Sequence, residues 1–261
     1  MTEIKDKKTI ETFFRKNPGL YVYQIGDLDD FFFKYTHWYA AINNDEIRQI
    51  VFTYSGTELP VLIAIADDNF YETEILLNEL IPVLPDKFYS HLSTGLDNLI
   101  VDSSRKIFHG RHYKMLLTKN KFKSTENDGK IRRLGKDDFA NIQSFYDSNY
   151  PQNWFDERML DTGKYLGYLI DDSITGIAGI HVYSEEYRIA ALGNIVTDVK
   201  YRSKSICRKL TSALCEDLFL TVDHIGLNVS SENLPAIKCY KNLGFEIIHE
   251  YNEIMFNKNL K

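Results

Sequence analysis

The stretch Leu192–Phe219, LGNIVTDVKYRSKSICRKLTSALCEDLF, decides the fold of this chain. The apolar run over residues 189–196 predicts a strand, and Thr197 and Asp198 form a short polar turn after it. From Ile206 onward, apolar residues recur at helical spacing and predict an amphipathic helix. Between the strand and the helix stands a cluster of basic residues, namely Lys200, Arg202, Lys204, Arg208 and Lys209.

A strand that leads through a small, basic loop into a helix is a recurrent phosphate-binding arrangement. The first N–H groups of a helix have no partner within the helix, and the helix dipole adds positive potential at the same end. The chain contains neither G-x-x-x-x-G-K-[ST] nor G-x-G-x-x-G, which excludes a Walker loop and a dinucleotide fingerprint.

A second informative segment follows at 227–245, LNVSSENLPAIKCYKNLGF. Its first residues predict the end of a strand. Asn233 is a favourable N-cap, Pro235 falls in the first helical turn, and Gly244 ends the helix. The residues at helical spacing between them are Ala236, Ile237, Tyr240 and Leu243.

These two segments resemble the GNAT superfamily of acyl-CoA-dependent N-acyltransferases. The family's pyrophosphate loop reads [Q/R]-x-x-G-x-[G/A], and Arg202 matches its first position. Ser205 and Cys207 stand where the family has glycine and glycine or alanine, so two Cβ atoms narrow the approach to a pyrophosphate. The pattern N-x-x-A-x-x-x-Y-x-x-x-G-F, from Asn233 to Phe245, is a specific signature of the family. The resemblance covers about the last 130 residues.

The resemblance implies an acetyl-CoA-dependent N-acetyltransferase. It would move an acetyl group to a primary amine of a small molecule or peptide by direct attack in a ternary complex. The backbone N–H of Val196 would polarise the thioester carbonyl, and Tyr240 would protonate the departing CoA thiolate. The implied cofactor-binding residues are Ile195, Val196, Thr197, Arg202, Ser203, Lys204, Ser205, Ile206, Cys207, Arg208, Asn233 and Tyr240.

The acceptor side is less well defined by the sequence. In the GNAT fold, two helices and their loop overhang the acceptor, which makes Tyr150, Trp154 and Phe155 candidates to line its pocket, although these residues also suit a core or rim position. No general base is assigned. Glu185, Glu186 and His181 precede the key strand, and water could serve instead.

Composition limits the other function classes. The chain has 261 residues and a net charge of −6, which argues against a general nucleic-acid binder or a binder of anionic membranes. Neither a signal peptide nor a transmembrane run stands out, and three cysteines without CxxC spacing suggest reduced thiols, so a cytoplasmic location is expected. No metal-ligand spacing is found. The oligomeric state stays open, with a homodimer as one alternative.

The two halves of the chain resemble one another in the order of their elements. YLIDDSITGIAGIHVYS predicts a hairpin, as does the segment from Trp38 with its turn at 43–45, and in each half an apolar strand then ends in acidic residues. We therefore expect an α/β (α+β) fold of two GNAT-like domains, each with a mixed, mostly antiparallel sheet flanked by helices. The alternative for the first half is an unrelated α+β domain. The expected domains are 1–118 (degenerate, without a cofactor site), a linker at 119–130, and the acetyltransferase domain at 131–261.

Local patterns in the first half predict a helix at 10–17, strands at 21–25, 59–66, 88–92 and 113–117, a helix at 73–84, and a helix or irregular segment at 96–108. In the second half, a strand and a helix follow residue 131, with a second short helix at 153–160.

Two other functions compete with this hypothesis. Because Ser205 and Cys207 replace glycines and no base is evident, the chain could be a non-catalytic acyl-CoA-binding or regulatory module. Alternatively, its first half could recruit a partner protein. A Tyr240→Phe change separates the first two functions, since it should lower transfer in an enzyme and change nothing in a binder.

Overall fold

The computed structural model describes residues 1–99 and 105–258. Its contacts divide the chain into two compact units. Unit 1 comprises Met1–Lys114, Val229–Glu232 and Ile247–Lys261, and unit 2 comprises Met115–Asn228 and Asn233–Glu246. The strand β6 (Arg105–Thr118) runs across the boundary between the two sets of residues.

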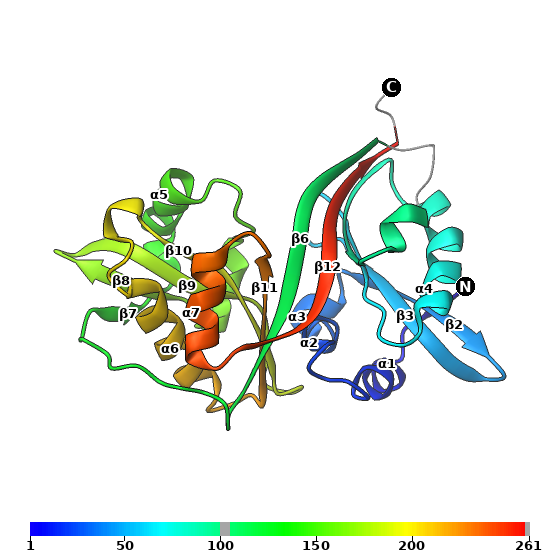
Figure 1. The fold of residues 1–261 in the computed structure, drawn as a ribbon, viewed down its shortest axis with the longest axis horizontal. Helices are drawn as coiled ribbons and strands as arrows, with labels where there is room; N and C mark the ends of the chain where they lie inside the picture. Colours follow the sequence, from blue (N-terminus) through cyan, green and yellow to red (C-terminus); the bar gives the residue numbers. More distant parts are fainter. Residues whose placement is uncertain (100–104, 259–261) are drawn as a thin grey trace. The chain divides into compact units, whose positions relative to one another are not determined.

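Unit 1, whose strands β2, β3 and β12 are labelled in Figure 1, contains strands in the order β1-β2-β3-β4-β5-β12. The neighbours pair antiparallel except for β4 and β5, which are parallel. The strands are β1 (Thr2–Ile4), β2 (Thr36–Asn43), β3 (Glu46–Tyr54), β4 (Val61–Ala64), β5 (Lys87–Ser93) and β12 (Glu246–Asn257). The helices are α1 (Lys7–Phe14), α2 (Val22–Gly26), α3 (Asp30–Phe33), α4 (Phe70–Leu80), η1 (Ile81–Val83) and η2 (Leu96–Leu99).

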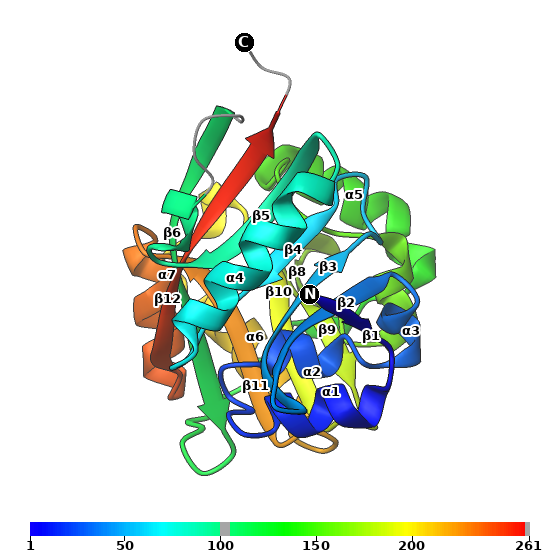
Figure 2. The same ribbon diagram turned by 90° about the vertical axis from the view of Figure 1, so that its right-hand side faces the viewer.

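Helix α4 lies over the sheet of unit 1 (Figure 2), and one buried cluster lies between α4 and strands β3, β4, β5 and β12. Alternate residues of β5 and β12 point to the same face, so Phe88 and Phe256 stack with ring centroids 5.0 Å apart. Leu76 and Leu77 of α4 are fully buried against this face. The apolar face of the strands, formed by alternate residues, thus packs against the apolar face of α4.

The last strand of the chain belongs to unit 1. Strand β12 pairs with β5 along a register that runs from Tyr251 opposite Ser93 to Asn257 opposite Lys87. A division of the chain at a single linker assigns this strand to the second domain, whereas its contacts assign Ile247–Lys261 to unit 1. The domain limits 1–118 and 131–261, with a linker at 119–130, therefore stay a prediction.

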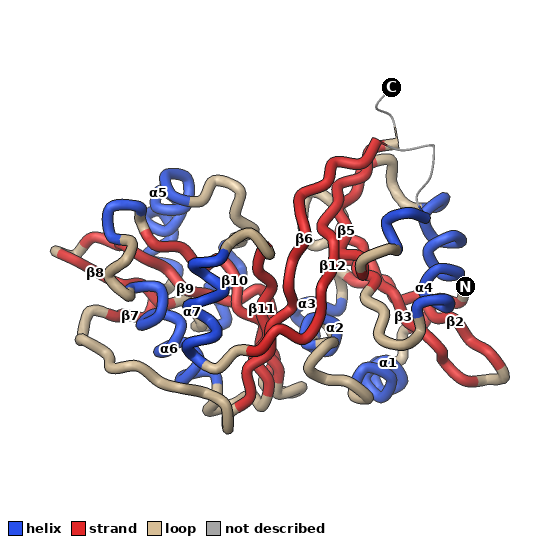
Figure 3. Tube along the Cα trace, viewed as in Figure 1, coloured by secondary structure: helices blue, strands red, loops and turns tan. Residues whose placement is uncertain are grey.

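Unit 2 has strands in the order β11-β10-β9-β8-β7 (Figure 3). The pair β10–β11 is parallel and the other pairs are antiparallel. The strands are β7 (Ile131–Arg133), β8 (Leu166–Ile170), β9 (Ser173–Ser184), β10 (Ile189–Thr197) and β11 (His224–Ser230). The helices are η3 (Lys136–Asp138), α5 (Phe139–Asn149), η4 (Glu157–Thr162), η5 (Val199–Tyr201), α6 (Ile206–Leu218) and α7 (Leu234–Leu243).

The predicted fold class is confirmed, since both units combine a mostly antiparallel sheet with flanking helices. The hairpin after Trp38 is also confirmed, with Asn44 and Asp45 in the left-handed region at its turn. The predicted helix at 73–84 corresponds to α4 and η1, and the predicted short helix at 153–160 is the 3-10 helix η4, which begins only at Glu157.

The predicted strand at 21–25 is wrong, because these residues form the helix α2. Their sequence, YVYQI, has high β-propensity, but the amide of Ile25 donates to the Tyr21 carbonyl over 2.9 Å. The helix is buried on all sides, so packing rather than propensity decides its conformation. The segment 96–108 splits into η2 and the start of β6, and residues 100–104 of that prediction lie outside the described residues.

Candidate active site

The two central strands of unit 2 separate along their length. Strands β10 and β11 pair in parallel from Ile189 opposite His224 to Leu192 opposite Leu227, and β10 then continues to Thr197. Beyond the paired part, the register of β10 against β9 shifts between Gly193 and Val196. A β-bulge of this kind re-aims the backbone, so Ile195, Val196 and Thr197 lie half-buried rather than in the core.

Asn194 forms the bulge. Its φ of 54° is in the left-handed region, which a non-glycine residue adopts only when its surroundings stabilise it. Here the Tyr146 hydroxyl donates to the Asn194 carbonyl over 2.7 Å, and the Asn194 amide nitrogen donates to the Tyr165 hydroxyl over 2.9 Å. The Asn194 side-chain oxygen accepts from the backbone N–H of Trp154 over 3.2 Å. The bulge is therefore tied to both α5 and the loop before η4.

An aromatic cluster surrounds this bulge. The ring of Phe155 lies 5.3 Å from that of Tyr146 and 5.4 Å from that of Tyr165, between centroids. Burial raises the pKa of Tyr146 and of Tyr165, so both hydroxyls stay protonated and act as hydrogen-bond donors. Tyr150 and Trp154 are 37% and 38% exposed at the rim of the cluster, where they can contact a bound molecule.

The loop before α6 presents backbone groups at its surface. Arg202, Ser203, Lys204 and Ser205 are all exposed, and the Arg202 Nε lies 3.4 Å from the carbonyl oxygen of Thr197, to which it donates. Ser203 and Ser205 have φ values of 63° and 62°. The GNAT loop pattern has glycine at the position of Ser205, and glycine adopts this conformation at no steric cost. The backbone turn is thus retained although the residue is serine.

Ser205 is also the N-cap of α6, and its side chain makes no capping hydrogen bond. The carbonyl of Ser205 accepts the first helical bond, from the N–H of Lys209 at 3.0 Å. The N–H groups of the first turn of α6 and the positive end of the helix dipole are therefore available at the loop. A diphosphate ester fits this combination of exposed amides and basic side chains.

Helix α7 carries the second predicted motif. The side chain of Asn233 accepts a hydrogen bond from the N–H of Ala236 over 3.2 Å, which confirms its role as N-cap. Gly244 ends the helix at φ 101°, and a Cβ at this position would lie 2.0 Å from the carbonyl oxygen of Lys121. Both the conformation and the close approach therefore require glycine at Gly244.

Tyr240, in the last turns of α7, is 7% exposed. Burial raises its pKa well above the usual value, and the neighbouring Cys207, Cys239 and Tyr150 raise it further. The Tyr240 hydroxyl is therefore fully protonated at neutral pH. Helix α7, which carries Tyr240, packs against α6.

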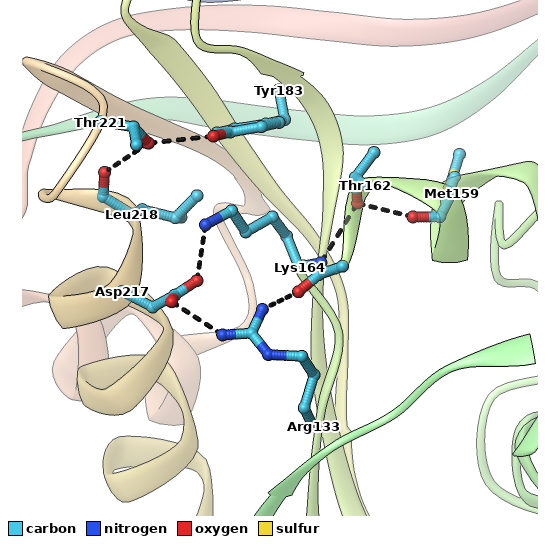
Figure 4. Close-up of polar contacts among 9 residues, drawn as sticks. Arg133, Met159, Thr162, Lys164, Tyr183, Asp217, Leu218 and Thr221 are labelled. Carbon is cyan, nitrogen blue, oxygen red and sulfur yellow. Dashed lines mark hydrogen bonds and ion pairs between the residues drawn. The ribbon is translucent and has the colours of Figure 1, made fainter.

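A charged cluster at the far end of α6 fixes the helix to the rest of the unit (Figure 4). Asp217 accepts from Lys164 Nζ and from Arg133 over 2.8 Å each, and the Lys164 ammonium lies 5.1 Å from the ring centroid of Tyr183. Although burial raises the pKa of Asp217, these two cations hold it below its ordinary value. The cluster joins the C-terminal end of α6 to the end of β7 and to the residues just before β8.

Of the three candidate bases before β10, the two glutamates lie far from the bulge, whereas His181 lies beside it. Glu185 and Glu186 are in the exposed turn that precedes Ile189, and β10 has nine residues. At about 3.3 Å per residue, the Ile189–Val196 segment separates them from the site by roughly 20 Å. His181 packs its ring over Gly193, where a Cβ would lie 2.1 Å from the ring.

Three features that shape this site were not predicted from the sequence, namely the bulge at Asn194 and the hydroxyls of Tyr146 and Tyr165 that bond to it. A polar Gly-Asn pair inside an otherwise apolar strand is a signal of a bulge and could have indicated Asn194. The two tyrosines come from segments distant in the sequence, and no local pattern relates their hydroxyls to the bulge.

The splayed parallel strands, the bulge and the loop that opens α6 define an acyltransferase fold of the GNAT type in unit 2. The sequence model of the Acetyltransferase (GNAT) family matches residues 130–245, and this part of the chain belongs to that family. Solved structures extend the similarity of fold to the whole chain, which thus contains two GNAT-like domains.

One curated relative is the L-amino acid N-acetyltransferase AaaT of Escherichia coli, 36% identical over 97 residues. These residues are 35% of this chain and 59% of that protein, so the match spans less than two thirds of the relative. A Drosophila protein of known structure covers 98% of this chain, and 97% of its own length is matched, with a TM-score of 0.73 and 12% identity. A tandem GNAT protein from the clavulanic acid biosynthesis pathway covers 100% of this chain and 99% of its own, with a TM-score of 0.61 and 10% identity.

Within residues 1–99 and 105–258, no group of three or more His, Cys, Asp or Glu side chains is arranged to hold a metal ion. In the same part of the chain, no helix is long and apolar enough to cross a membrane.

Proposed function

We propose that this protein transfers an acetyl group from acetyl-CoA to a primary amine of a small molecule or peptide, by direct attack in a ternary complex. The observation that carries the proposal is the left-handed conformation of Ser203 and Ser205 in the loop that opens α6. It keeps the backbone turn of the family's pyrophosphate loop although neither residue is glycine. The matching family model supports acyl transfer as the reaction class.

In this proposal, the loop and the first turn of α6 bind the pyrophosphate of acetyl-CoA. The N–H groups of residues 203–208 donate to it, and Arg202, Lys204 and Arg208 supply positive charge. The separated end of β10, residues 195–197, pairs with the pantetheine arm, and the exposed side of Asn233 contacts the same arm while it caps α7.

The chemistry rests on two groups of this chain. The backbone N–H of Val196, re-aimed by the bulge at Asn194, polarises the thioester carbonyl. Tyr240 donates its proton to the sulfur that leaves as CoA. Its raised pKa keeps it protonated until a thiolate, which is a strong base in a site removed from water, is formed beside it.

The acceptor binds on the aromatic side of the bulge, against Tyr150, Trp154 and Phe155. A curated relative is named as an L-amino acid N-acetyltransferase, so an α-amino group is one acceptor worth testing first. We assign no general base, and a water molecule held at the bulge is our proposal for the route by which the amine loses its proton.

We further propose a cytoplasmic protein that uses neither nucleic acid nor a membrane as partner, in which unit 1 is a degenerate domain without an acyl-CoA site. The net charge of −6 supports the part of this proposal that concerns nucleic acid and membranes. The competing function is a non-catalytic acyl-CoA-binding module. It is favoured by the replacement of the family's small loop residues by Ser205 and Cys207. A homodimer remains a proposal as well.

The first test is calorimetric titration of the protein with acetyl-CoA. We expect saturable micromolar binding, and we expect Arg202→Glu to abolish it. Arg188→Glu is the matched control, because Arg188 is an exposed arginine paired with Asp223 at the opposite end of β10. No binding at millimolar acetyl-CoA would sink the proposal.

The second test separates an enzyme from a binder. Tyr240→Phe should retain acetyl-CoA binding and lower the rate of transfer to an L-amino acid panel by about a hundredfold, the usual contribution of a general acid. Unchanged turnover in this variant would remove Tyr240 from the mechanism. Binding without turnover in the unaltered protein, across acceptors of every amine class, would favour the binding module.

A further inference from the structure

Two of the three cysteines of this chain lie side by side in unit 2. The Sγ atoms of Cys207 and Cys239 are 3.6 Å apart, although the residues are 32 positions apart in the sequence. Cys207 is in the first turn of α6 and Cys239 is in the middle of α7, two helices that pack together (Figure 1). Both side chains are partly exposed, and both are thiols.

The geometry points to a redox site: we propose that hydrogen peroxide or an organic hydroperoxide oxidises Cys207 and Cys239 to a disulfide, and that this disulfide prevents acetyl-CoA binding. The second half of this inference rests on the proposed function, because it requires that the first turn of α6 bind the cofactor. The first half concerns only the two thiols.

Cys207 is the residue that reacts first. It is at the N-terminal end of α6, where the helix dipole and the unpaired N–H groups stabilise a thiolate. The thiol of Cys239 donates a hydrogen bond to the Cys207 sulfur, and this bond holds the pKa of Cys207 below its ordinary value. The same contact raises the pKa of Cys239, which therefore remains the neutral donor of the pair.

The reaction balances with a single hydroperoxide. The Cys207 thiolate attacks one peroxide oxygen and breaks the O–O bond, which gives a sulfenic acid and, after protonation of the leaving oxygen, water or an alcohol. The Cys239 thiol loses its proton, its sulfur attacks the Cys207 sulfur, and the sulfenic oxygen leaves as water. The two sulfur atoms together lose two electrons, which reduce the peroxide.

Formation of the bond would draw the two helices together. A disulfide requires an S–S separation of about 2.05 Å, which is roughly 1.5 Å less than the present one. This contraction acts on the first turn of α6, whose N–H groups belong to the proposed pyrophosphate site, and on the residue next to Tyr240. Close-packed helices transmit such a shift rather than absorb it.

The third cysteine provides an internal control. Cys215 lies on the same helix as Cys207 but is fully buried, and burial raises its pKa. It should therefore remain a thiol at peroxide concentrations that oxidise the pair completely.

The sequence makes the disulfide easy to identify. Trypsin releases the three cysteines in three different peptides, 205–208, 210–238 and 239–241. The intact protein, treated with a small excess of hydrogen peroxide, alkylated and digested, should yield a disulfide-linked pair of the peptides 205–208 and 239–241. The peptide 210–238 should be alkylated in full.

Binding is then measured on the same samples. We expect the oxidised protein to bind acetyl-CoA at least about tenfold more weakly than the reduced protein, and dithiothreitol to restore the affinity. Cys239→Ser should form no cross-link, and with diamide, which converts dithiols to disulfides, it should keep its affinity. Acetyl-CoA added before peroxide should slow formation of the cross-link.

The outcomes distinguish the two proposals. If the cross-linked peptides do not form, the redox site is wrong whatever the protein binds. If they form and the affinity for acetyl-CoA is unchanged, the disulfide does not control the cofactor site, and the regulatory inference is overturned. If reduced protein fails to bind acetyl-CoA, the proposed function fails, while the digest still decides whether the two thiols form a redox pair.

Discussion

The hydroxyl of Tyr146 donates a hydrogen bond to the backbone carbonyl of Asn194 over 2.7 Å, and both groups are buried. This bond links the helix α5 to the bulge of β10. A carbonyl in a bulge has lost its partner in the sheet, so a side-chain donor takes the place of the missing strand hydrogen bond.

We expect Tyr146→Phe to lower the free energy of unfolding by about 1–3 kcal/mol, because the substitution leaves a buried carbonyl without its donor. The bulge should become mobile, and transfer of the acetyl group should fall more than cofactor affinity does. Urea denaturation and steady-state kinetics measure the two effects.

Tyr168→Phe is the matched control for that variant. Tyr168 is a buried tyrosine of the same unit whose hydroxyl bonds to Asp128, away from the bulge. If both substitutions lower transfer equally, the bond to Asn194 has no particular role in the site.

We expect Ser205→Gly to increase the affinity of the loop before α6 for acetyl-CoA. Ser205 holds a φ of 62°, which costs a residue with a Cβ of order 1 kcal/mol and costs glycine nothing. Ser205→Gly should therefore bind acetyl-CoA several-fold more tightly, since it also removes a Cβ from the proposed pyrophosphate site. Calorimetry measures the change.

Ser205→Ala separates these contributions, because alanine removes the hydroxyl but keeps the Cβ and the unfavourable φ. It should bind no more tightly than the unaltered protein. An alanine variant as good as the glycine variant would mean that the hydroxyl, and not the backbone, limits the affinity.

The ion-pair cluster of Figure 4 should give unit 2 a pH-dependent stability. The pKa of Asp217 is lowered in the folded state, so its contribution is complete above the unfolded pKa of about 3.9 and is lost as the pH falls through the folded value. Asp217→Asn should cost on the order of 1 kcal/mol at pH 7, reduced by solvent because Arg133 is half exposed. The deficit should shrink as the pH falls below the unfolded value of about 3.9, as followed by thermal unfolding.

Unit 1 contains a second carboxylate of this type, Glu253. It is 15% exposed, accepts from the hydroxyls of Tyr89 and Tyr251, and lies 3.5 Å from His91 Nε2. Burial raises its pKa, but His91 and His112 outweigh this and hold the pKa below its ordinary value. Glu253 thus stabilises unit 1 above a pH of about 4.3, and this stability is lost as the pH falls through the lower, folded pKa.

Glu253→Gln keeps the shape of the side chain and removes its charge. We expect it to destabilise unit 1 at pH 7 and to flatten the pH dependence of its unfolding below about pH 4.3. Hydrogen exchange resolves the two units, which a single melting curve does not. An unaltered pH profile would show that the carboxylate is already protonated in the folded protein.

Where a helix of unit 2 is bounded by a capping residue or a glycine, the sequence predicts its limits to within a residue or two. Helix α6 begins at Ile206, and α7 lies between the cap at Asn233 and the stop at Gly244, because cap, dipole and left-handed glycine are local effects. The segment at 21–25 shows the limit, since its β-branched and aromatic residues favour a strand while its buried surroundings favour a helix.

The site was predictable only in part, for a similar reason. The loop residues from Arg202 to Cys207 and Tyr240 belong to contiguous motifs. The hydroxyls of Tyr146 and Tyr165 reach Asn194 across 48 and 29 positions of sequence, and the partner of Cys207 is 32 positions away. Such contacts depend on the packing of the sheet and its helices, which no spacing in the sequence encodes.

The pairing of β12 with β5 has a consequence for the way the protein is made. Ser90 and Ile254 face one another in this pair but are 164 positions apart, so a ribosome synthesises most of the chain before the strand that completes unit 1 emerges. Residues 87–93 are thus translated well before residues 251–257, and this edge of β5 lacks its partner strand in the interval. Until β12 emerges, β5 exposes an unpaired edge, which a chaperone or a neighbouring nascent chain can cover.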